Sequence, residues 1–200
     1  MRCWALAALL ACSCTTSPAG PREDERVERP ARPPLAPFDE CVVTTYREPA
    51  TSAAHVPVCS SLPLASHPPT GGEHFGTWAA FGVYDAPIPW GFLIHSMEHG
   101  AVVLGYRCEE PCPEVVSELV AIAEGIDDPR CRGEDFPRRV IVAPMPDLDV
   151  ALVALAWEHG YLATCLDPPS LRAFVDARYG RGPEDTCFAG ADRAADGWCP

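Results

Sequence analysis

Apolar residues form two short runs and one spaced series in the second half of the chain. Residues 101–106 and 139–143 are rich in branched apolar side chains, and each run predicts a buried strand. Between them, residues 113–126 carry apolar side chains at intervals of three and four, which is the spacing of one helix face. Pro113 opens this series, and proline fits the first turn of a helix. The pattern therefore predicts a strand, a helix and a second strand in succession.

Another strand and another helix are predicted towards the C-terminus. The turn at residues 144–147 precedes residues 150–157, which we expect to return as a strand, and residues 168–179 predict a closing helix. The order β-α-β-β-α predicts an α+β fold, in which helices cover one face of a sheet. Residues 181–200 show neither the helical nor the strand periodicity of apolar residues, so we expect an arm that disulfides fasten to the domain.

We expect a single disulfide-rich domain from residue 38 to residue 200, which is long enough to bury one hydrophobic core. The first third of this domain is irregular and rich in proline, although residues 41–46 predict a strand. A short helical segment is expected at residues 93–99. Gly100 follows it, and glycine commonly ends a helix.

The N-terminus resembles an export signal. Residues 1–11 combine Arg2 with an apolar run that is shorter than the roughly 20 residues needed to span a bilayer. The run ends in Leu-Leu-Ala-Cys, which is similar to the bacterial lipobox, so Cys12 is the lipidation candidate; the alternative is a cleaved secretory signal in which Cys12 has no role. Residues 12–37 are rich in proline and charge, and we expect a disordered tether. These features predict an extracytoplasmic bacterial protein anchored in a membrane at the periplasm or cell surface.

The cysteine content agrees with export. Eight cysteines lie in the predicted domain, and an even number in an oxidising compartment predicts disulfides whose pairing the sequence leaves open. The close spacing of two of them would also suit half of a zinc site, which is the alternative for Cys108 and Cys112. The disulfide candidates are Cys41, Cys59, Cys108, Cys112, Cys131, Cys165, Cys187 and Cys199.

Composition excludes several classes of function. All 15 basic residues are arginines, and the absence of lysine rules out a Walker-type phosphate loop and a lysine Schiff base. The net charge of −13 argues against binding to nucleic acid and against electrostatic binding to anionic lipid. A lipid anchor would instead provide the contact with the membrane. No protein partner is indicated.

Histidines provide the candidate chemistry. His95, Glu98 and His99 lie within five residues, and His74 follows a glycine-containing turn upstream. On a helix, residues four apart share one face with Cβ atoms about 5–6 Å apart, whereas on a strand the distance would be about 13 Å. A helix therefore permits shared ligation, and imidazole and carboxylate are ligands for zinc and copper. We predict His74, His95, Glu98 and His99 as ligands of a zinc or copper ion.

The same residues match the H-x-x-E-H pattern of a zinc protease. That motif belongs in a long helix with an acidic third ligand, but Gly100 ends this helix early. Glu158 and Glu184 are the available third ligands. A metal-dependent hydrolase is therefore a minor alternative, and no catalytic residue is assigned.

Two histidine motifs also resemble those of a known family. Pro-Pro-Thr-Gly-Gly-x-His at residues 68–74, His-Ser-x-Glu-His-Gly at residues 95–100 and Trp78 are similar to the prokaryotic family called domain of unknown function 3105. The resemblance covers about residues 60–180, with Gly71 in place of the serine that is usual in the family. It implies an exported or membrane-tethered protein, and it implies no established activity.

Three interpretations of the histidines follow. Metal binding is our best hypothesis. A buried hydrogen-bond network between the histidines and Glu98, holding the turn at residues 71–72 against the strand that begins at Ala101, is the first alternative. A ligand- or partner-binding pocket is the second, lined by the histidines with Trp78, Tyr84 and Trp90. The other histidines, expected on the surface, are His55, His67 and His159.

Overall fold

The computed structural model describes residues 22–136, 138–192 and 198–199. The signal segment expected at residues 1–11 and the lipidation candidate Cys12 lie outside the described residues. Within the described part of the chain, no helix has the length and apolar character needed to cross a bilayer.

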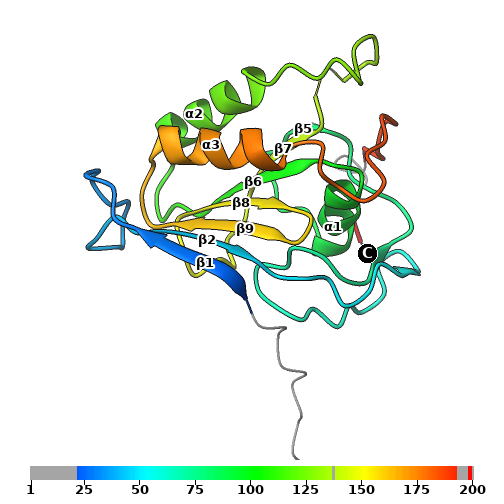
Figure 1. Cartoon of the computed structure of the whole chain (residues 1–200), viewed down its shortest axis with the longest axis horizontal. Coiled ribbons are helices and arrows are strands. Elements are labelled where there is room, and N and C mark those ends of the chain that lie inside the picture. Colours follow the sequence, from blue (N-terminus) through cyan, green and yellow to red (C-terminus); the bar gives the residue numbers. More distant parts are fainter. Residues whose placement is uncertain (1–21, 137, 193–197, 200) are drawn as a thin grey trace, which may run out of the picture.

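The centre of the fold is a seven-stranded sheet, drawn as arrows in Figure 1. Neighbouring strands are antiparallel except that β7 runs parallel to both β6 and β5. A small second sheet pairs β3 with β4 in parallel. In spatial order the large sheet contains β1 (Glu23–Glu28), β2 (Val43–Arg47), β9 (His159–Ala163), β8 (Leu152–Ala156), β6 (Val102–Tyr106), β7 (Val140–Pro144) and β5 (Gly82–Val83), and the small sheet contains β3 (His55–Val56) and β4 (His74–Phe75).

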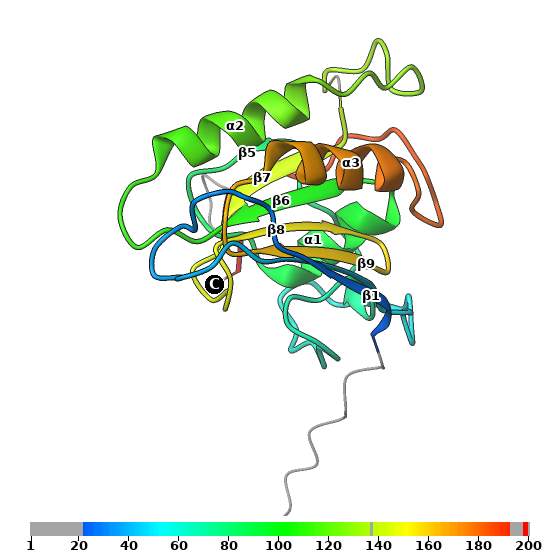
Figure 2. The ribbon, with the colours of Figure 1, turned by 60° about the vertical axis from the view of Figure 1, so that its left-hand side comes forward.

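Helices lie on both faces of the large sheet. Those of the described residues are α1 (Trp90–Glu98), α2 (Pro113–Glu124) and α3 (Pro168–Arg178). Figures 1 and 2 show α2 and α3 together on one face and α1 on the other. In β6, Val102 and Leu104 pack in the hydrophobic cluster of α2 and α3, whereas Val103 packs in that of α1. The α+β class is confirmed. The prediction that helices cover only one face of the sheet is wrong, because β6 is apolar on both sides.

The predicted order of elements holds from β6 to α3, with one strand missed. Residues 150–157 cover β8, and the chain then reverses within two residues into β9. Glu158 takes a left-handed conformation in this turn, with φ of 61°. Two-residue hairpin turns favour asparagine or glycine at such positions, so Trp157 and Glu158 carry no local turn signal.

The predicted tether is partly folded. Residues 23–28 form β1, an edge strand with every residue exposed. Arg47 in β2 places its Nη1 2.7 Å from Oε2 of Glu23, and the guanidinium of Arg22 lies 4.1 Å from the ring centroid of Tyr46. The prediction of disorder is wrong for these residues, because ladder hydrogen bonds to β2 hold a strand that buries no side chain of its own.

All eight cysteines of the described part are paired in disulfides. Cys108 and Cys112 bond to each other, so the alternative of a half zinc site at this pair is wrong. Two of the bridges fasten the C-terminal arm to the domain, as expected. The four disulfides are Cys41–Cys165, Cys59–Cys199, Cys108–Cys112 and Cys131–Cys187.

Candidate metal centre

The small sheet and helix α1 bring the histidines together. The β3–β4 pairing sets His55 directly opposite His74, and their ring centroids lie 4.8 Å apart. Helix α1 packs closely on β4 because Gly91 has no side chain: a Cβ there would lie 2.6 Å from the ring of Phe75. This approach places the last turn of α1, with His95, beside the two histidines of the small sheet, and the rings of His95 and His74 are 4.8 Å apart.

Four donor side chains converge on one point, and we call them the first group: His55, His74, His95 and Glu98. Their donor atoms all lie within 4.8 Å of one another. Glu98 is central, since its Oε2 lies 2.9 Å from Nε2 of His74, 3.5 Å from Nε2 of His55 and 3.9 Å from Nε2 of His95. The helical spacing of His95 and Glu98, one turn apart, puts both on the face that meets the small sheet.

The backbone fixes the tautomers of two of these rings. Nδ1 of His95 lies 2.6 Å from the carbonyl oxygen of Phe75, and Nδ1 of His74 lies 2.9 Å from that of Gly72. A carbonyl oxygen only accepts, so each Nδ1 carries a hydrogen, and each ring, when neutral, turns an unprotonated Nε2 towards the group. Metal-binding histidines are commonly held in this way by a second hydrogen bond.

The close contact between His74 and Glu98 calls for a proton or a metal ion. A neutral His74 and an ionised Glu98 would both offer lone pairs across their 2.9 Å contact. Either a proton on one of them or a metal ion between the donors makes this contact favourable. Because His74, His95 and Glu98 are almost completely buried, water does not screen the repulsion.

Burial favours the neutral form of two imidazoles, those of His95 and His99. It lowers the pKa of His95 to about 3, and the charges of the neighbouring histidines act in the same direction. Burial likewise lowers the pKa of His99. Neutral imidazole is the form that binds a metal ion, so both rings are ready to act as ligands at neutral pH.

His99 lies beside the first group and connects it to the C-terminal arm. Its Nε2 is 3.0 Å from Nε2 of His95 and 3.1 Å from Oε2 of Glu184, and its Nδ1 is hydrogen-bonded to the hydroxyl of Thr186. The donor atoms of Glu98, His99 and Glu184 also lie within 4.8 Å of one another, and we call these three the second group. The four residues predicted as ligands are therefore neighbours, with His99 in the second group.

Aromatic rings form one wall of the centre. The ring centroid of Trp78 lies 4.2 Å from that of His99 and 5.0 Å from that of His95, and Trp157 stands edge-on to His74 at 6.0 Å. Solvent reaches the centre at its two ends, where the side chains of His55 and Glu184 are each about half exposed, at 50% and 49%. The centre is thus a buried chain of donors with two exposed ends.

The aromatic pocket does not form as expected. Tyr84 donates its hydroxyl hydrogen to the carbonyl oxygen of Ala80, and Trp90 donates from Nε1 to Asp147. Trp78 alone of the three expected lining residues packs on the histidines of the centre. A ligand pocket lined by all three aromatic residues is therefore wrong.

His55 is the residue that sequence reasoning missed, since it was expected on the surface. It lies 19 positions before His74, in a strand of two residues. So short a strand shows neither the helical nor the strand periodicity of apolar residues. The half-exposed side chain agrees with the surface expectation, but its ring is directed to the cluster.

The two carboxylates considered for the protease alternative have different positions. Glu184 reaches His99, whereas Glu158 binds Nη2 of Arg47 at 2.7 Å and the backbone N–H of Ala50 at 3.0 Å. Glu158 therefore stabilises the turn between β8 and β9. Of the two, only Glu184 is placed to complete a site with the histidines.

A third cluster of potential donors is structural. Asp128 lies near Cys131 and Cys187, but these two cysteines form a disulfide and offer no thiolate. Asp128 instead accepts hydrogen bonds from Nε of Arg139 and from the hydroxyl of Tyr179. Burial alone would raise the pKa of Asp128, but these hydrogen bonds and the charge of Arg139 hold it below its usual value.

Comparison with known proteins gives a family and no activity. A search of curated proteins and a search of solved structures found no match. A family model described as "Protein of unknown function (DUF3105)" matches residues 55–189, a span that begins at His55 and includes every donor of both groups. Since this match covers more than half of the 200 residues, the chain belongs to the DUF3105 family of proteins of unknown function.

Proposed function

We propose that this domain binds a divalent transition metal ion, Zn²⁺ or Cu²⁺, through His55, His74, His95 and Glu98. One observation carries the proposal: Nε2 of His74 and the carboxylate of Glu98 face each other at 2.9 Å in a buried position. The hydrogen bond from Nδ1 to Gly72 keeps His74 in this tautomer. With His74 neutral and Glu98 ionised, a metal ion between the donors would convert this repulsive contact into a set of bonds.

The spacing of the donors supports this proposal. Ligand atoms bound to one ion at about 2.0–2.1 Å lie roughly 3.0–3.5 Å apart. The distances from Oε2 of Glu98 to the three Nε2 atoms, 2.9, 3.5 and 3.9 Å, bracket this range. His55 is the most exposed donor, so it has room to adjust to an ion.

The ligand types favour Zn²⁺ or Cu²⁺ over softer or harder ions. Three imidazole nitrogens with one carboxylate oxygen suit these two ions, whereas Cu⁺ prefers thiolate or thioether sulfur and Ca²⁺ prefers oxygen. Met97 is fully buried in the hydrophobic cluster of α1, and the cysteines of the described part are in disulfides. Sulfur ligation is therefore not offered at this centre.

Four protein ligands would occupy every position of a tetrahedral ion, which is the arrangement of structural sites. We therefore propose binding and no reaction for the first group. A metal-dependent hydrolase would need a coordination position open to water, and it remains the minor alternative.

We also propose that the protein is exported and held at a membrane by a lipid on Cys12. The apolar run before Cys12 is the basis of this proposal. Four disulfides support it, because such bonds persist in oxidising compartments outside the cytoplasm.

Elemental analysis of the oxidised, untagged protein tests metal binding. We expect at least one equivalent of zinc or copper per chain after dialysis, and a large loss in His95→Gln. The matched control is His67→Asn, because His67 lies outside both groups and bonds to the carbonyl oxygen of Asp147. Circular dichroism shows whether each variant is folded. The proposal is refuted if the wild-type protein stays metal-free and takes up neither ion at submicromolar concentration.

The competing function is a metal-free hydrogen-bond network. The 2.9 Å contact between His74 and Glu98 favours it, since a proton on either group would make a normal hydrogen bond. In that case ¹⁵N NMR of the metal-free protein finds a proton between these two residues, and added Zn²⁺ leaves the imidazole signals unchanged. A shift of the Nε2 signals of His55, His74 and His95 on adding one equivalent supports metal binding.

A further inference from the structure

The second group extends the centre beyond a single ion. Glu98, His99 and Glu184 bring their donor atoms within 4.8 Å of one another, and Glu98 is the member shared with the first group. His99 and Glu98 are each 4% exposed, and Oε2 of Glu184 lies 3.1 Å from Nε2 of His99. This spacing is that of two ligands on one ion.

One ion cannot bind the donors of both groups. Two ligands on opposite sides of an ion with bonds of about 2.0–2.2 Å lie at most about 4.4 Å apart. The six donors of the two groups do not fall within 4.8 Å of one another as one set. The donors form a chain that leads from His55 and His74 through Glu98 to Glu184.

We propose that the centre holds two divalent metal ions bridged by the carboxylate of Glu98. The inference rests on the proposed function, since the first ion occupies the first group. The second ion is bound by Glu98, His99 and Glu184. A carboxylate has two oxygens and can bind one ion with each, and ions in such pairs lie about 3.5–4 Å apart.

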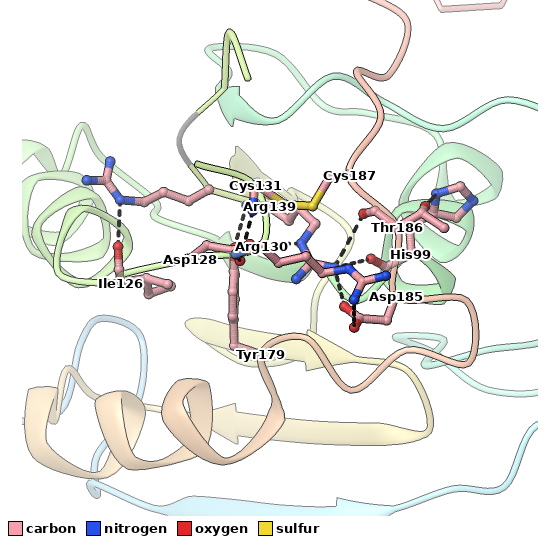
Figure 3. Close-up of polar contacts among 11 residues, drawn as sticks. His99, Ile126, Asp128, Arg130, Cys131, Arg139, Tyr179, Asp185, Thr186 and Cys187 are labelled. Atoms are coloured by element: carbon pink, nitrogen blue, oxygen red, sulfur yellow. Dashed lines mark hydrogen bonds and ion pairs between the residues drawn. A yellow bond between two sulfur atoms is a disulfide. The ribbon is translucent and has the colours of Figure 1, made fainter. Parts of the chain in front are cut away.

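The arm that carries Glu184 is held firmly in place, as Figure 3 shows for its neighbours. The backbone N–H of Glu184 donates to the carbonyl oxygen of Glu98 at 3.1 Å. Asp185 accepts a hydrogen bond from Nη1 of Arg139, and the disulfide Cys131–Cys187 closes the arm onto the domain. The carboxylate of Glu184 is thus positioned by the fold, as a metal ligand needs to be.

The second ion would differ chemically from the first. It has three protein ligands, and Glu184 is 49% exposed, so a coordination position is open to water. An open position beside a second ion is what allows bound water to be activated or an oxyanion to bind. The first ion would then be structural and the second exchangeable.

Metal stoichiometry tests this inference. Metal-free full-length protein is loaded with Zn²⁺, dialysed and analysed for zinc per chain. We expect two equivalents in the wild type, one in Glu184→Gln, and two in the matched control Glu124→Gln, which removes an exposed carboxylate on α2. Since Glu184 is half exposed, both variants are expected to fold, and circular dichroism checks this.

Copper gives an independent readout. Two Cu²⁺ ions about 4 Å apart couple magnetically, so the wild type loaded with Cu²⁺ should show a weakened, coupled EPR signal. Glu184→Gln should show the full signal of one isolated Cu²⁺. One equivalent with an isolated signal in the wild type overturns the two-ion centre and leaves the proposed function standing. Two equivalents in Glu184→Gln also overturn it, and no bound metal in any variant overturns both proposals.

Discussion

The guanidinium of Arg139 donates from Nη1 to the backbone carbonyl oxygen of His99, 2.8 Å away. The same side chain binds Asp128 through Nε at 3.1 Å and is 2% exposed (Figure 3). A buried cation immediately before β7 therefore holds the end of α1, where His99 follows the helix. The geometry of the candidate metal centre depends on this contact between the sheet and the helix.

Replacing Arg139 should destabilise the whole domain. Arg139→Met leaves the carboxylate of Asp128 buried without its cationic partner, and breaking a buried ion pair in this way costs about 3–5 kcal/mol. Urea unfolding measures the loss in the free energy of unfolding. Arg132→Met is the control, because Arg132 pairs with Asp127 at the surface, where such pairs contribute about 0–1 kcal/mol. Equal losses in the two variants would contradict the structural role of Arg139.

His55 should affect metal affinity and leave the fold intact. Its side chain is half exposed, so His55→Asn removes a ligand without opening a cavity in the core. We expect affinity for Zn²⁺ or Cu²⁺ to fall by at least about 10–100-fold, as changes around metal sites commonly cause. Competition with a chromogenic chelator measures the affinity, and thermal unfolding of the metal-free variant should match that of the wild type. Unchanged affinity would remove His55 from the ligand set.

Gly100 should be sensitive even to alanine. Its φ of 86° is left-handed, and an added Cβ would lie 2.8 Å from Nη1 of Arg139 and 3.1 Å from Cα of Gly180. We expect Gly100→Ala to lower the free energy of unfolding by at least about 1–2 kcal/mol from the backbone strain alone. Gly76→Ala is the control, because an added Cβ there meets nothing within 4 Å. Chemical denaturation measures the free energy of unfolding of both variants. Similar small losses in the two would refute the backbone strain assigned to Gly100.

His159 should make stability depend on pH. Burial lowers its pKa below 6.5, while its hydrogen bond to the carbonyl oxygen of Trp157 acts in the opposite direction. Below pH 6.5 the unfolded chain binds a proton at His159 that the folded chain does not, so stability falls as the pH drops. Removing this group should make the decline less steep. Urea unfolding of the metal-free wild type and of His159→Gln at pH 8 and pH 5 tests this. If the difference in unfolding free energy between the two proteins is the same at both pH values, His159 is not the source of the pH dependence.

Cys12 should determine where the protein is found. If a lipid is attached there, Cys12→Ser moves the protein from the membrane fraction to the soluble fraction after cell fractionation. Cys14→Ser is the matched control and should stay with the membrane. Membrane retention of Cys12→Ser would refute the lipid anchor.

Local sequence was sufficient for the elements with strong periodicity. The spaced apolar series predicted α2, and the apolar runs predicted β6 and β7, because each element buries side chains whose spacing repeats along the chain. Gly100 marked the end of α1, so the shared face of His95, Glu98 and His99 followed from helix geometry.

The rest was decided by contacts between segments far apart in the sequence. His55 joins His74 only because β3 pairs with β4, and Glu184 meets His99 only because the arm folds back over α1. The pairing of the cysteines, the strand β1 and the turn at Glu158 likewise depend on distant partners. Periodicity records how one segment meets the core, whereas the donors of a metal centre are gathered by tertiary packing, for which the sequence carries no local pattern.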